Sequence, residues 1–226
     1  MGAVPALVVF DCDGVLSVAR SSWSLVHHTY GSDNRQDLSE FFGGVIDVHE
    51  FIRRDVTRWQ ALQPGLTPAR LQQDVLPRMA PMQGAAALVS GLLDAGAAVA
   101  CVSGGLDLLV RPFVEGLGID SALTFANGLG TDASGALDGS GLVRVPPHRK
   151  DRIVHQLMDQ LDLDGDDVAA IGDTHDDAAM FLPSVRGIAF NSTDARLRAA
   201  AHHVEDRPDL RLLAPLLGLP PLGAAP

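Results

Sequence analysis

Apolar and polar positions follow two patterns that alternate along most of the chain. Short apolar runs bounded by glycine or acidic residues are typical of buried strands, and apolar residues spaced three and four apart are typical of helices. The runs that predict strands, the first of them ending in a loop, lie at 6–17, 97–105, 122–127, 168–173 and 187–191. The segments that predict helices lie at 84–96, 106–118, 150–163, 177–185 and 193–201. This alternation predicts an α/β fold with a doubly wound parallel sheet.

Residues 17–80 interrupt the alternation, because they show helical spacing and no strand pattern. Thr67, followed by a proline, is a typical helix start with a capping side chain. We therefore predict a core formed by residues 1–16 and 81–226, and a small helical cap domain formed by the inserted residues 17–80. A segment rich in glycine, aspartate and serine, 128–145, predicts a hairpin or flap, and the sequence leaves open whether it contributes to a site.

Composition narrows the class of protein. The 226 residues are 46% hydrophobic and 20% charged, which is ordinary for a globular chain, and the formal charge of −11 argues against nucleic acid as a partner. No apolar run reaches the roughly 20 residues of a membrane span. Cys12 and Cys101 both lie in apolar runs and predict buried thiols of a reducing compartment. A cytoplasmic protein is the expectation.

Polar side chains follow three of the predicted strands. Asp11, Ser103 and Asp173 each stand at the end of one. In doubly wound sheets ligands bind at the carboxyl ends of the strands, so adjacent strands would bring the three side chains to one crevice. The helices of residues 17–80 would then cover that crevice.

The acidic residues predict a cation at this edge. Asp11 and Asp13 lie two apart, so on an extended backbone they point to the same side. Asp173, Asp176 and Asp177 add further carboxylates. Repulsion between such groups is normally offset by a cation or a shared proton, and an oxygen-only ligand set favours Mg²⁺ over Zn²⁺.

A carboxylate can also act as a nucleophile toward phosphorus. Phosphoryl transfer then needs positive charge and hydrogen-bond donors around the transferring oxygens. Ser103 and the backbone N–H groups of Gly104 and Gly105, at a predicted helix start, form a natural anion site, and Lys150 supplies a cation.

Four motifs in order, "DCDGVL", "VSGG", Lys150 and "GDTHDD", resemble those of the haloacid dehalogenase superfamily. "VSGG", "FANGL" and "GDTHDDAAMF" are most similar to its phosphoserine phosphatase branch, whose helical cap follows the first motif. The resemblance implies that Asp11 attacks phosphorus and that Asp13 acts as acid and then base. It implies that Asp11, the backbone carbonyl of Asp13 and Asp173 hold Mg²⁺, while Asp177 holds it through water or orients Lys150.

The same resemblance assigns the remaining groups around the phosphate. Ser103, Gly104 and Lys150 would bind the phosphate, and Asn127 would have a secondary role near the site. The implied activity is a Mg²⁺-dependent phosphatase acting on a small phosphorylated metabolite through an aspartyl-phosphate.

The substrate end departs from the branch. Arg20 stands where the branch has a glutamate that binds the substrate amine, and Asp55 stands where a cap arginine binds its carboxylate, with Arg53 and Arg54 nearby. Trp23 is the cap aromatic that we place near the substrate. An arginine at position 20 suits a more acidic substrate than phosphoserine.

Three functions therefore stay open within the superfamily. They are a phosphoserine phosphatase, a phosphatase of another phosphorylated acid or sugar, and a phosphomutase or phosphotransferase. A phospho-accepting signalling receiver fits poorly, because its aspartate would lie in a middle strand of a much shorter chain. The sequence does not fix the oligomeric state.

Overall fold

A single sheet of seven strands organises the described part of the chain, residues 2–184 and 186–223 of the computed structural model. Its strand order is β4-β3-β2-β1-β5-β6-β7, and every neighbouring pair is parallel except β3 and β4. The strands are β1 (Leu7–Phe10), β2 (Ala98–Leu106), β3 (Thr124–Thr131), β4 (Leu137–Leu142), β5 (Val168–Gly172), β6 (Arg186–Phe190) and β7 (His203–Glu205). The predicted α/β fold with a doubly wound, mostly parallel sheet is confirmed.

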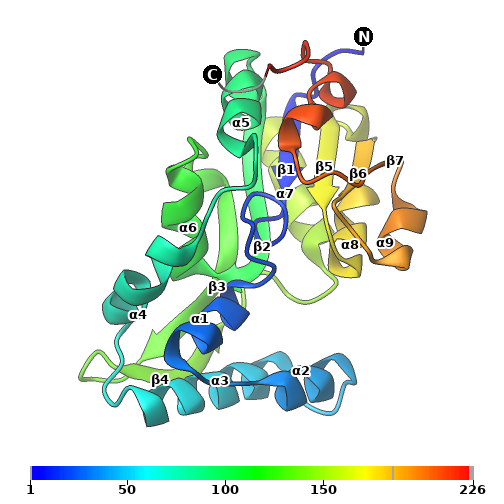
Figure 1. Cartoon of the computed structure of the whole chain (residues 1–226). Coiled ribbons are helices and arrows are strands. Elements are labelled where there is room, and N and C mark those ends of the chain that lie inside the picture. The colour runs from blue at the N-terminus through cyan, green and yellow to red at the C-terminus, as the bar shows by residue number, and fades with distance from the viewer. Residues whose placement is uncertain (1, 185, 224–226) are drawn as a thin grey trace.

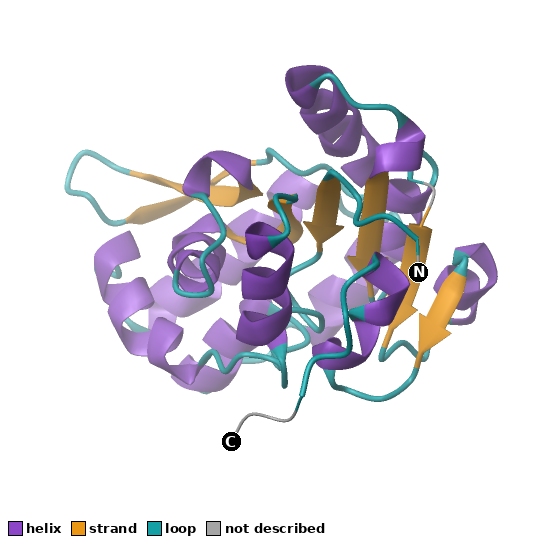
Figure 2. Cartoon of the chain, turned by 90° about the horizontal axis from the view of Figure 1, so that it is seen from above, coloured by secondary structure: helices purple, strands orange, loops and turns teal. Residues whose placement is uncertain are grey.

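Helices cover both faces of this sheet (Figure 2). The helices that pack on it are α5 (Ala85–Asp94), α6 (Asp107–Glu115), α7 (Lys150–Leu161), α8 (Ala178–Phe181) and α9 (Ala195–Ala200). Alternate residues of β1 point to opposite faces, as the period of a strand requires. Val8 and Phe10 join the cluster that contains α5 and α6, whereas Leu7 and Val9 join the cluster that contains α7, α8 and α9. Burial on both faces explains why β1 is apolar throughout.

Four helices lie between β1 and α5, beyond the carboxyl ends of the strands (Figure 1). They are α1 (Ser22–Tyr30), α2 (Arg35–Phe42), α3 (Val48–Leu62) and α4 (Pro68–Val75). The Thr67 side chain accepts a hydrogen bond from the backbone N–H of Arg70, with Pro68 in the first helical position, as the sequence predicts. No helix in the described ranges is both long and apolar enough to cross a membrane.

The glycine-rich segment 128–145 forms the hairpin of β3 and β4, which runs beside α3 (Figure 1). A side chain at Gly141 would meet Ile52 of α3 at 2.4 Å, so glycine is needed for this close approach. The Gln60 side chain donates hydrogen bonds to the backbone carbonyls of Leu66 and Leu137. The hairpin therefore packs in the same layer as α3.

The structure differs from the sequence prediction in three places. β7 was not predicted, because three residues give no periodicity. The glycine turn of 103–105 lies inside β2, and the pairing of β2 with β3 shifts register between Val102 and Leu106. The predicted helix 177–185 is instead a 3-10 turn, η4 (His175–Asp177), followed by the short α8, and residue 185 lies outside the described residues.

Candidate active site

The buried end of β1 positions Asp11 against Lys150. The backbone N–H of Asp11 continues the ladder to β5 by donating to the carbonyl of Ile171, and the residue is 6% exposed. Nζ of Lys150, at the first position of α7, lies 2.9 Å from Asp11 Oδ1 and 2.6 Å from Asp177 Oδ1. Asp11 Oδ2 accepts no hydrogen bond from the residues that the structure describes, so one oxygen stays available for chemistry.

The Lys150 ammonium is a single buried cation beside several carboxylates. Burial raises the pKa of Asp11 well above its usual value; Lys150 partly offsets this, and Asp177, Asp173 and Asp13 reinforce it. Burial alone lowers the pKa of Lys150, but Asp11 and Asp177 outweigh it, so the net shift is upward and the amine keeps its proton. These carboxylates still outnumber the Lys150 ammonium and the half-exposed Arg20 guanidinium that contacts Asp173, which leaves a deficit of positive charge that a further cation would fill.

Asp13 is held by the start of α1. Its Oδ2 accepts hydrogen bonds from the backbone N–H of Ser22 at 2.7 Å and from its hydroxyl at 2.8 Å. Burial raises the pKa of Asp13, and the Ser22 bonds and Lys150 limit the rise. Its other oxygen, Oδ1, is buried and has no hydrogen-bond partner in the described ranges. A carboxyl group with a raised pKa and one free oxygen can hold and release a proton at that atom.

Asp173 follows β5, and its side chain lies close to Gly14 in the loop after β1. A side chain at Gly14, which has φ of 79°, would meet Asp173 Oδ2 at 2.1 Å, so glycine is required there. Burial, reinforced by Asp177, raises the pKa of Asp173 to about 6. Asp177 is fully buried and its Oδ2 accepts from the backbone N–H groups of Asp173 and Thr174, which fixes the turn.

Ser103 and Gly104 lie beside this cluster, at the carboxyl end of β2. Ser103 Oγ accepts from the N–H of Gly105, which leaves the hydroxyl proton free to donate. A side chain at Gly105 would meet Ser22 Oγ at 2.4 Å. Asn127 donates to the carbonyl of Gly104 and accepts from the N–H of Val145, so it ties β2 to the chain that leaves the hairpin.

The acidic cluster fits a hard divalent cation. Oxygen atoms of Asp11, Asp173 and Asp177 lie within 4.8 Å of one another, and Asp173 Oδ1 is buried with no hydrogen-bond partner among residues 2–184 and 186–223. A buried carboxylate oxygen without a donor is unfavourable unless a cation or water meets it. An all-oxygen donor set with an unfilled oxygen is the chemistry that Mg²⁺ selects.

One cavity of about 430 Å³ is lined by Asp11, Asp13, Ser103, Gly104, Lys150 and Asp173, and by Arg20. Arg20 Nη1 lies 2.8 Å from Asp173 Oδ2, and Nη2 donates to the backbone carbonyl of Asn191. The Arg20 side chain is 54% exposed, so this contact is open to solvent. Arg20 therefore lies against a candidate metal ligand.

The structure does not bring Arg53 and Arg54 to the cavity. Arg53 is exposed and pairs with Glu50 one helical turn away. Arg54 contacts Glu50, Asp37 and Glu40, and these carboxylates hold the guanidinium on the far side of α3. Neither arginine lines the cavity, because both lie on the face of α3 that pairs with acids.

Asp55 is also withdrawn from the cavity. It is fully buried, and both of its oxygens accept from the Asn34 amide while His27 Nε2 lies 3.1 Å away. The position where the resemblance expects a carboxylate-binding arginine thus belongs to the interior of the cap.

The cap side of the cavity is apolar instead. Trp23 reaches it, as expected, and its indole N–H donates to the carbonyl of Gly104. The sequence analysis missed the other apolar wall residues, which are Leu38, Phe41, Phe42, Val48, Phe51 and Ile52. The polar side chains of Ser21, Ser24 and Asn34 also line the cavity on this side. The aromatic side chains form a continuous row, with ring centroids 5.9 Å apart for Trp23 and Phe51 and 5.1 Å apart for Phe41 and Phe51. The sequence offered one indication of this apolar wall, because three phenylalanines occur within the eleven residues 41–51.

Comparison with known proteins defines the class. The haloacid dehalogenase-like hydrolase family matches residues 8–182, and the chain belongs to that family. It is 31% identical over 95% of its length to a phosphoserine phosphatase of Archaeoglobus fulgidus, of which it spans 60%. It is 30% identical to a phosphoserine phosphatase of Lactococcus lactis, over 93% of this chain and 95% of that protein.

A solved structure of a phosphoserine phosphatase has the same fold as this chain. A phospho-aspartyl intermediate analogue of a phosphoserine phosphatase superposes with a TM-score of 0.77 at 25% identity, covering 97% of this chain and 100% of the other. The predicted membership of the superfamily, and the likeness to its phosphoserine phosphatase branch, are confirmed. The predicted enzyme class, a phosphatase, is confirmed with them.

Proposed function

We propose that this chain is a Mg²⁺-dependent phosphatase that hydrolyses a small phosphomonoester through an aspartyl-phosphate on Asp11. The observation that carries the proposal is the convergence of Asp11, Asp13, Lys150 and Asp173 on one cavity. The fold places each of them at the carboxyl end of a strand or the start of a helix, where phosphoryl transfer can be positioned.

The steps follow from the atoms. Asp11 Oδ2 attacks phosphorus, and the bond from phosphorus to the alcohol oxygen breaks as Asp13 Oδ1 gives that oxygen a proton. Water then attacks the phosphorus of the aspartyl-phosphate and gives its proton to Asp13, which frees Asp11 and phosphate. Lys150 and the Ser103 hydroxyl donate to the phosphoryl oxygens, together with the N–H of Gly104.

Asp11, the backbone carbonyl of Asp13 and Asp173 would hold Mg²⁺. When bound, the ion supplies charge neutralisation for the phosphoryl oxygens and for the crowded carboxylates. Asp177 orients Lys150 and the turn after β5 through the hydrogen bonds described above. Asn127 positions Gly104, which is a supporting role.

The cavity wall supports an apolar leaving group. The cap contributes aromatic and aliphatic side chains, while Arg53, Arg54 and Asp55 are turned into ion pairs or the cap interior. The amine of phosphoserine would lose hydration against this wall and meet no carboxylate on the cap side, and Arg20, the guanidinium that lines the cavity, is already paired with Asp173. We therefore propose a phosphate ester of an aromatic or alkyl alcohol as the preferred substrate class, in place of phosphoserine or a sugar phosphate.

The proposal also assigns a role to each of the two predicted domains. Residues 17–80 act as a cap that encloses the alcohol part of the substrate, with the hairpin of β3 and β4 packed against α3 behind it, and residues 1–16 and 81–226 carry the chemistry. Cys12 and Cys101 are buried and unpaired, which supports the expected cytoplasmic location.

The test is phosphate release with Mg²⁺ from matched esters: phenyl, hexyl, glyceryl and glucose phosphates beside phosphoserine. We expect kcat/KM for phenyl or hexyl phosphate to exceed that for phosphoserine by more than about tenfold. Equal or better hydrolysis of phosphoserine would overturn the substrate class, and no release from any ester would overturn the phosphatase. Transfer to an added sugar without free phosphate would indicate a mutase.

A pair of variants locates the selectivity. Phe41→Ala removes a wall residue, and Phe113→Ala removes a similarly half-buried phenylalanine of α6 outside the cavity. The first should lower kcat/KM for phenyl phosphate by about tenfold and leave methyl phosphate nearly unchanged. The second should affect both esters equally.

A further inference from the structure

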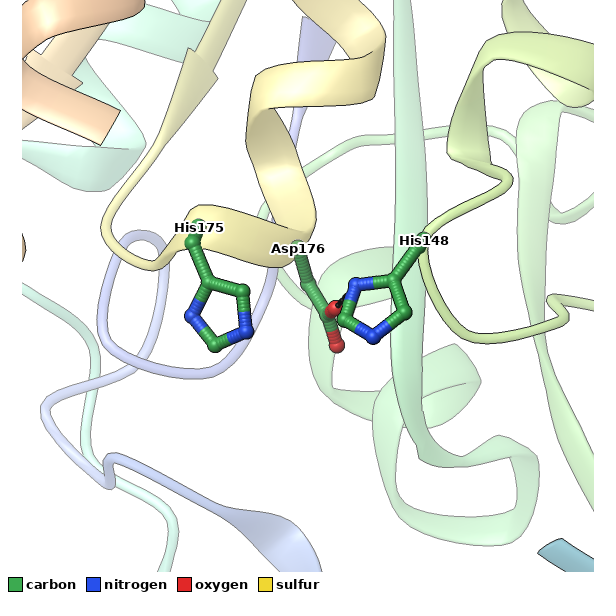
Figure 3. A group of neighbouring side chains, drawn as sticks. All are labelled: His148, His175 and Asp176. Atoms are coloured by element: carbon green, nitrogen blue, oxygen red, sulfur yellow. Dashed lines mark ion pairs between the residues drawn. The ribbon is translucent and has the colours of Figure 1, made fainter. Parts of the chain in front are cut away.

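Two histidines and an aspartate gather at the mouth of the cavity, apart from the oxygen ligands proposed for Mg²⁺ (Figure 3). His148 precedes α7, and His175 and Asp176 form the start of η4 after β5. One ligand atom from each lies within 4.8 Å of the others. The loop before α7 and the turn after β5 thus present three metal-binding side chains to one point.

The ligand atoms of the three side chains point toward one another. Nδ1 of His148 contacts Asp176 Oδ1, and the two imidazole rings have centroids 5.4 Å apart. Asp176 Oδ1 is buried yet accepts no geometrically sound hydrogen bond from residues 2–184 and 186–223. Figure 3 shows the carboxylate between the two rings. A carboxylate oxygen so placed is better matched to a shared cation than to a single N–H.

Asp194 determines which nitrogen of the His175 ring carries the proton and how the ring is oriented. Asp194 Oδ2 lies 2.9 Å from His175 Nδ1 and also accepts from the His175 backbone N–H at 3.0 Å. A carboxylate on Nδ1 holds the proton there, which leaves the lone pair of Nε2 free, and Nε2 faces Asp176 (Figure 3). This carboxylate–histidine arrangement is how proteins orient and strengthen a ligating imidazole.

We propose that His148, His175 and Asp176 form a second cation site, selective for a divalent transition metal of the Zn²⁺ class. Imidazole nitrogen suits such metals, whereas the oxygen-only cluster of Asp11 and Asp173 suits Mg²⁺. Three protein ligands leave a coordination position open to water or to a substrate oxygen.

The proposed Zn²⁺ site lies where a bound ion would affect access to the cavity. His148 and Asp176 line the cavity, and the His175 ring lies 6.4 Å from that of Phe42 in α2. A bound ion would connect the loop before α7 to η4, close to Phe42 of α2. It therefore narrows and stiffens the entrance, and micromolar Zn²⁺ slows turnover at saturating Mg²⁺.

Binding is tested without substrate. Isothermal titration of Zn²⁺ into the whole protein in excess Mg²⁺ should show one ion per chain. His148→Gln and His175→Gln should each weaken it by more than about tenfold, while His155→Gln, an exposed histidine of α7, leaves it unchanged. The Co²⁺-loaded wild type should give a visible spectrum with nitrogen ligation.

Two results would overturn the site. One is Zn²⁺ binding that both His variants retain and that Asp173→Asn abolishes, which would place the ion in the Mg²⁺ cluster. The other is wild-type binding no tighter than that of the His148→Gln and His175→Gln double variant, together with a Co²⁺ spectrum of oxygen ligation alone. Circular dichroism of each variant separates loss of ligand from loss of fold.

Discussion

Nζ of Lys150 lies 2.9 Å from Oδ1 of Asp11, although the two residues are 139 positions apart in the chain. Both side chains are almost fully buried, and Lys150 is the only lysine in the sequence. The contact joins the first strand of the sheet to the start of α7. It links the stability of the fold to the chemistry of the site, because the same ammonium also holds Asp177.

Lys150→Met should therefore destabilise the protein and abolish activity. Removing one partner of a buried ion pair costs about 3–5 kcal/mol, because the remaining carboxylates lose their counter-charge. Urea denaturation measures the change. Arg149→Met is the matched control, since Arg149 is exposed and pairs with Asp151 at the surface; it should change the unfolding free energy by less than about 1 kcal/mol. Equal effects of both variants would show that the buried contact is unimportant.

Asp13→Asn should slow hydrolysis in a way that depends on the leaving group. Loss of a general acid lowers kcat by about 10²–10⁴ for an alkyl phosphate, whose alcohol must be protonated as it leaves. p-Nitrophenyl phosphate needs little protonation, so its first step should persist and give a burst of p-nitrophenol. Stopped-flow absorbance measures this burst. The same loss of rate in the first step for both esters would argue against Asp13 as the acid.

Mg²⁺ should stabilise the fold through Asp173. An ion that binds only the folded state at 100 times its Kd adds about 2.7 kcal/mol. Thermal unfolding with and without the ion measures this gain. Asp173→Asn should remove most of it, while Asp47→Asn, which alters an exposed helix cap of α3, should keep it. A gain that survives in Asp173→Asn would place the ion elsewhere.

Tyr30 offers a test of the cap that is independent of catalysis. Burial, reinforced by its hydrogen bond to Asp74 of α4, raises the pKa of Tyr30 to about 12. The phenol is protonated to higher pH in the folded state, so its contribution to stability is constant below about pH 10 and the unfolding free energy falls between about pH 10 and 12. Because Tyr30 is the only tyrosine, ultraviolet absorbance reports its titration directly.

The matched variant for that titration is Tyr30→Phe. It should lack both the absorbance change and the part of the alkaline destabilisation that belongs to this phenol. A midpoint near pH 10 in the folded wild type would show that Tyr30 is exposed and that α1 and α4 are not joined as described.

The sequence predicted which polar side chains meet at the strand ends, because strand ends are set by local patterns. Asp11 follows a buried apolar run, and Asp173 follows another, so parallel pairing of β1 with β5 brings them together. The position of Lys150 at the start of a helix was likewise readable from the helical spacing after it. The residue roles carried over from the resemblance stay predictions.

The cap was predicted less well, because the face that a helical residue presents depends on its partners. Arg54 could have pointed into the cavity, but Asp37 and Glu40 of α2 hold it outside. Asp55 lies one position further along α3 and is buried by contacts with α1 and the start of α2. Such pairings join different helices and leave no mark in the spacing of one helix.

The proposed mechanism requires phosphoryl transfer to Asp11, and chemical trapping can detect the phosphorylated residue. An acyl phosphate is reduced by borohydride, which converts the aspartate to homoserine, so mass spectrometry can locate the phosphorylated residue. Enzyme quenched during turnover of phenyl phosphate with Mg²⁺ should carry homoserine at position 11, and Asp11→Asn should carry none. Reduction at another aspartate, or no reduction during measured turnover, would contradict the proposed mechanism.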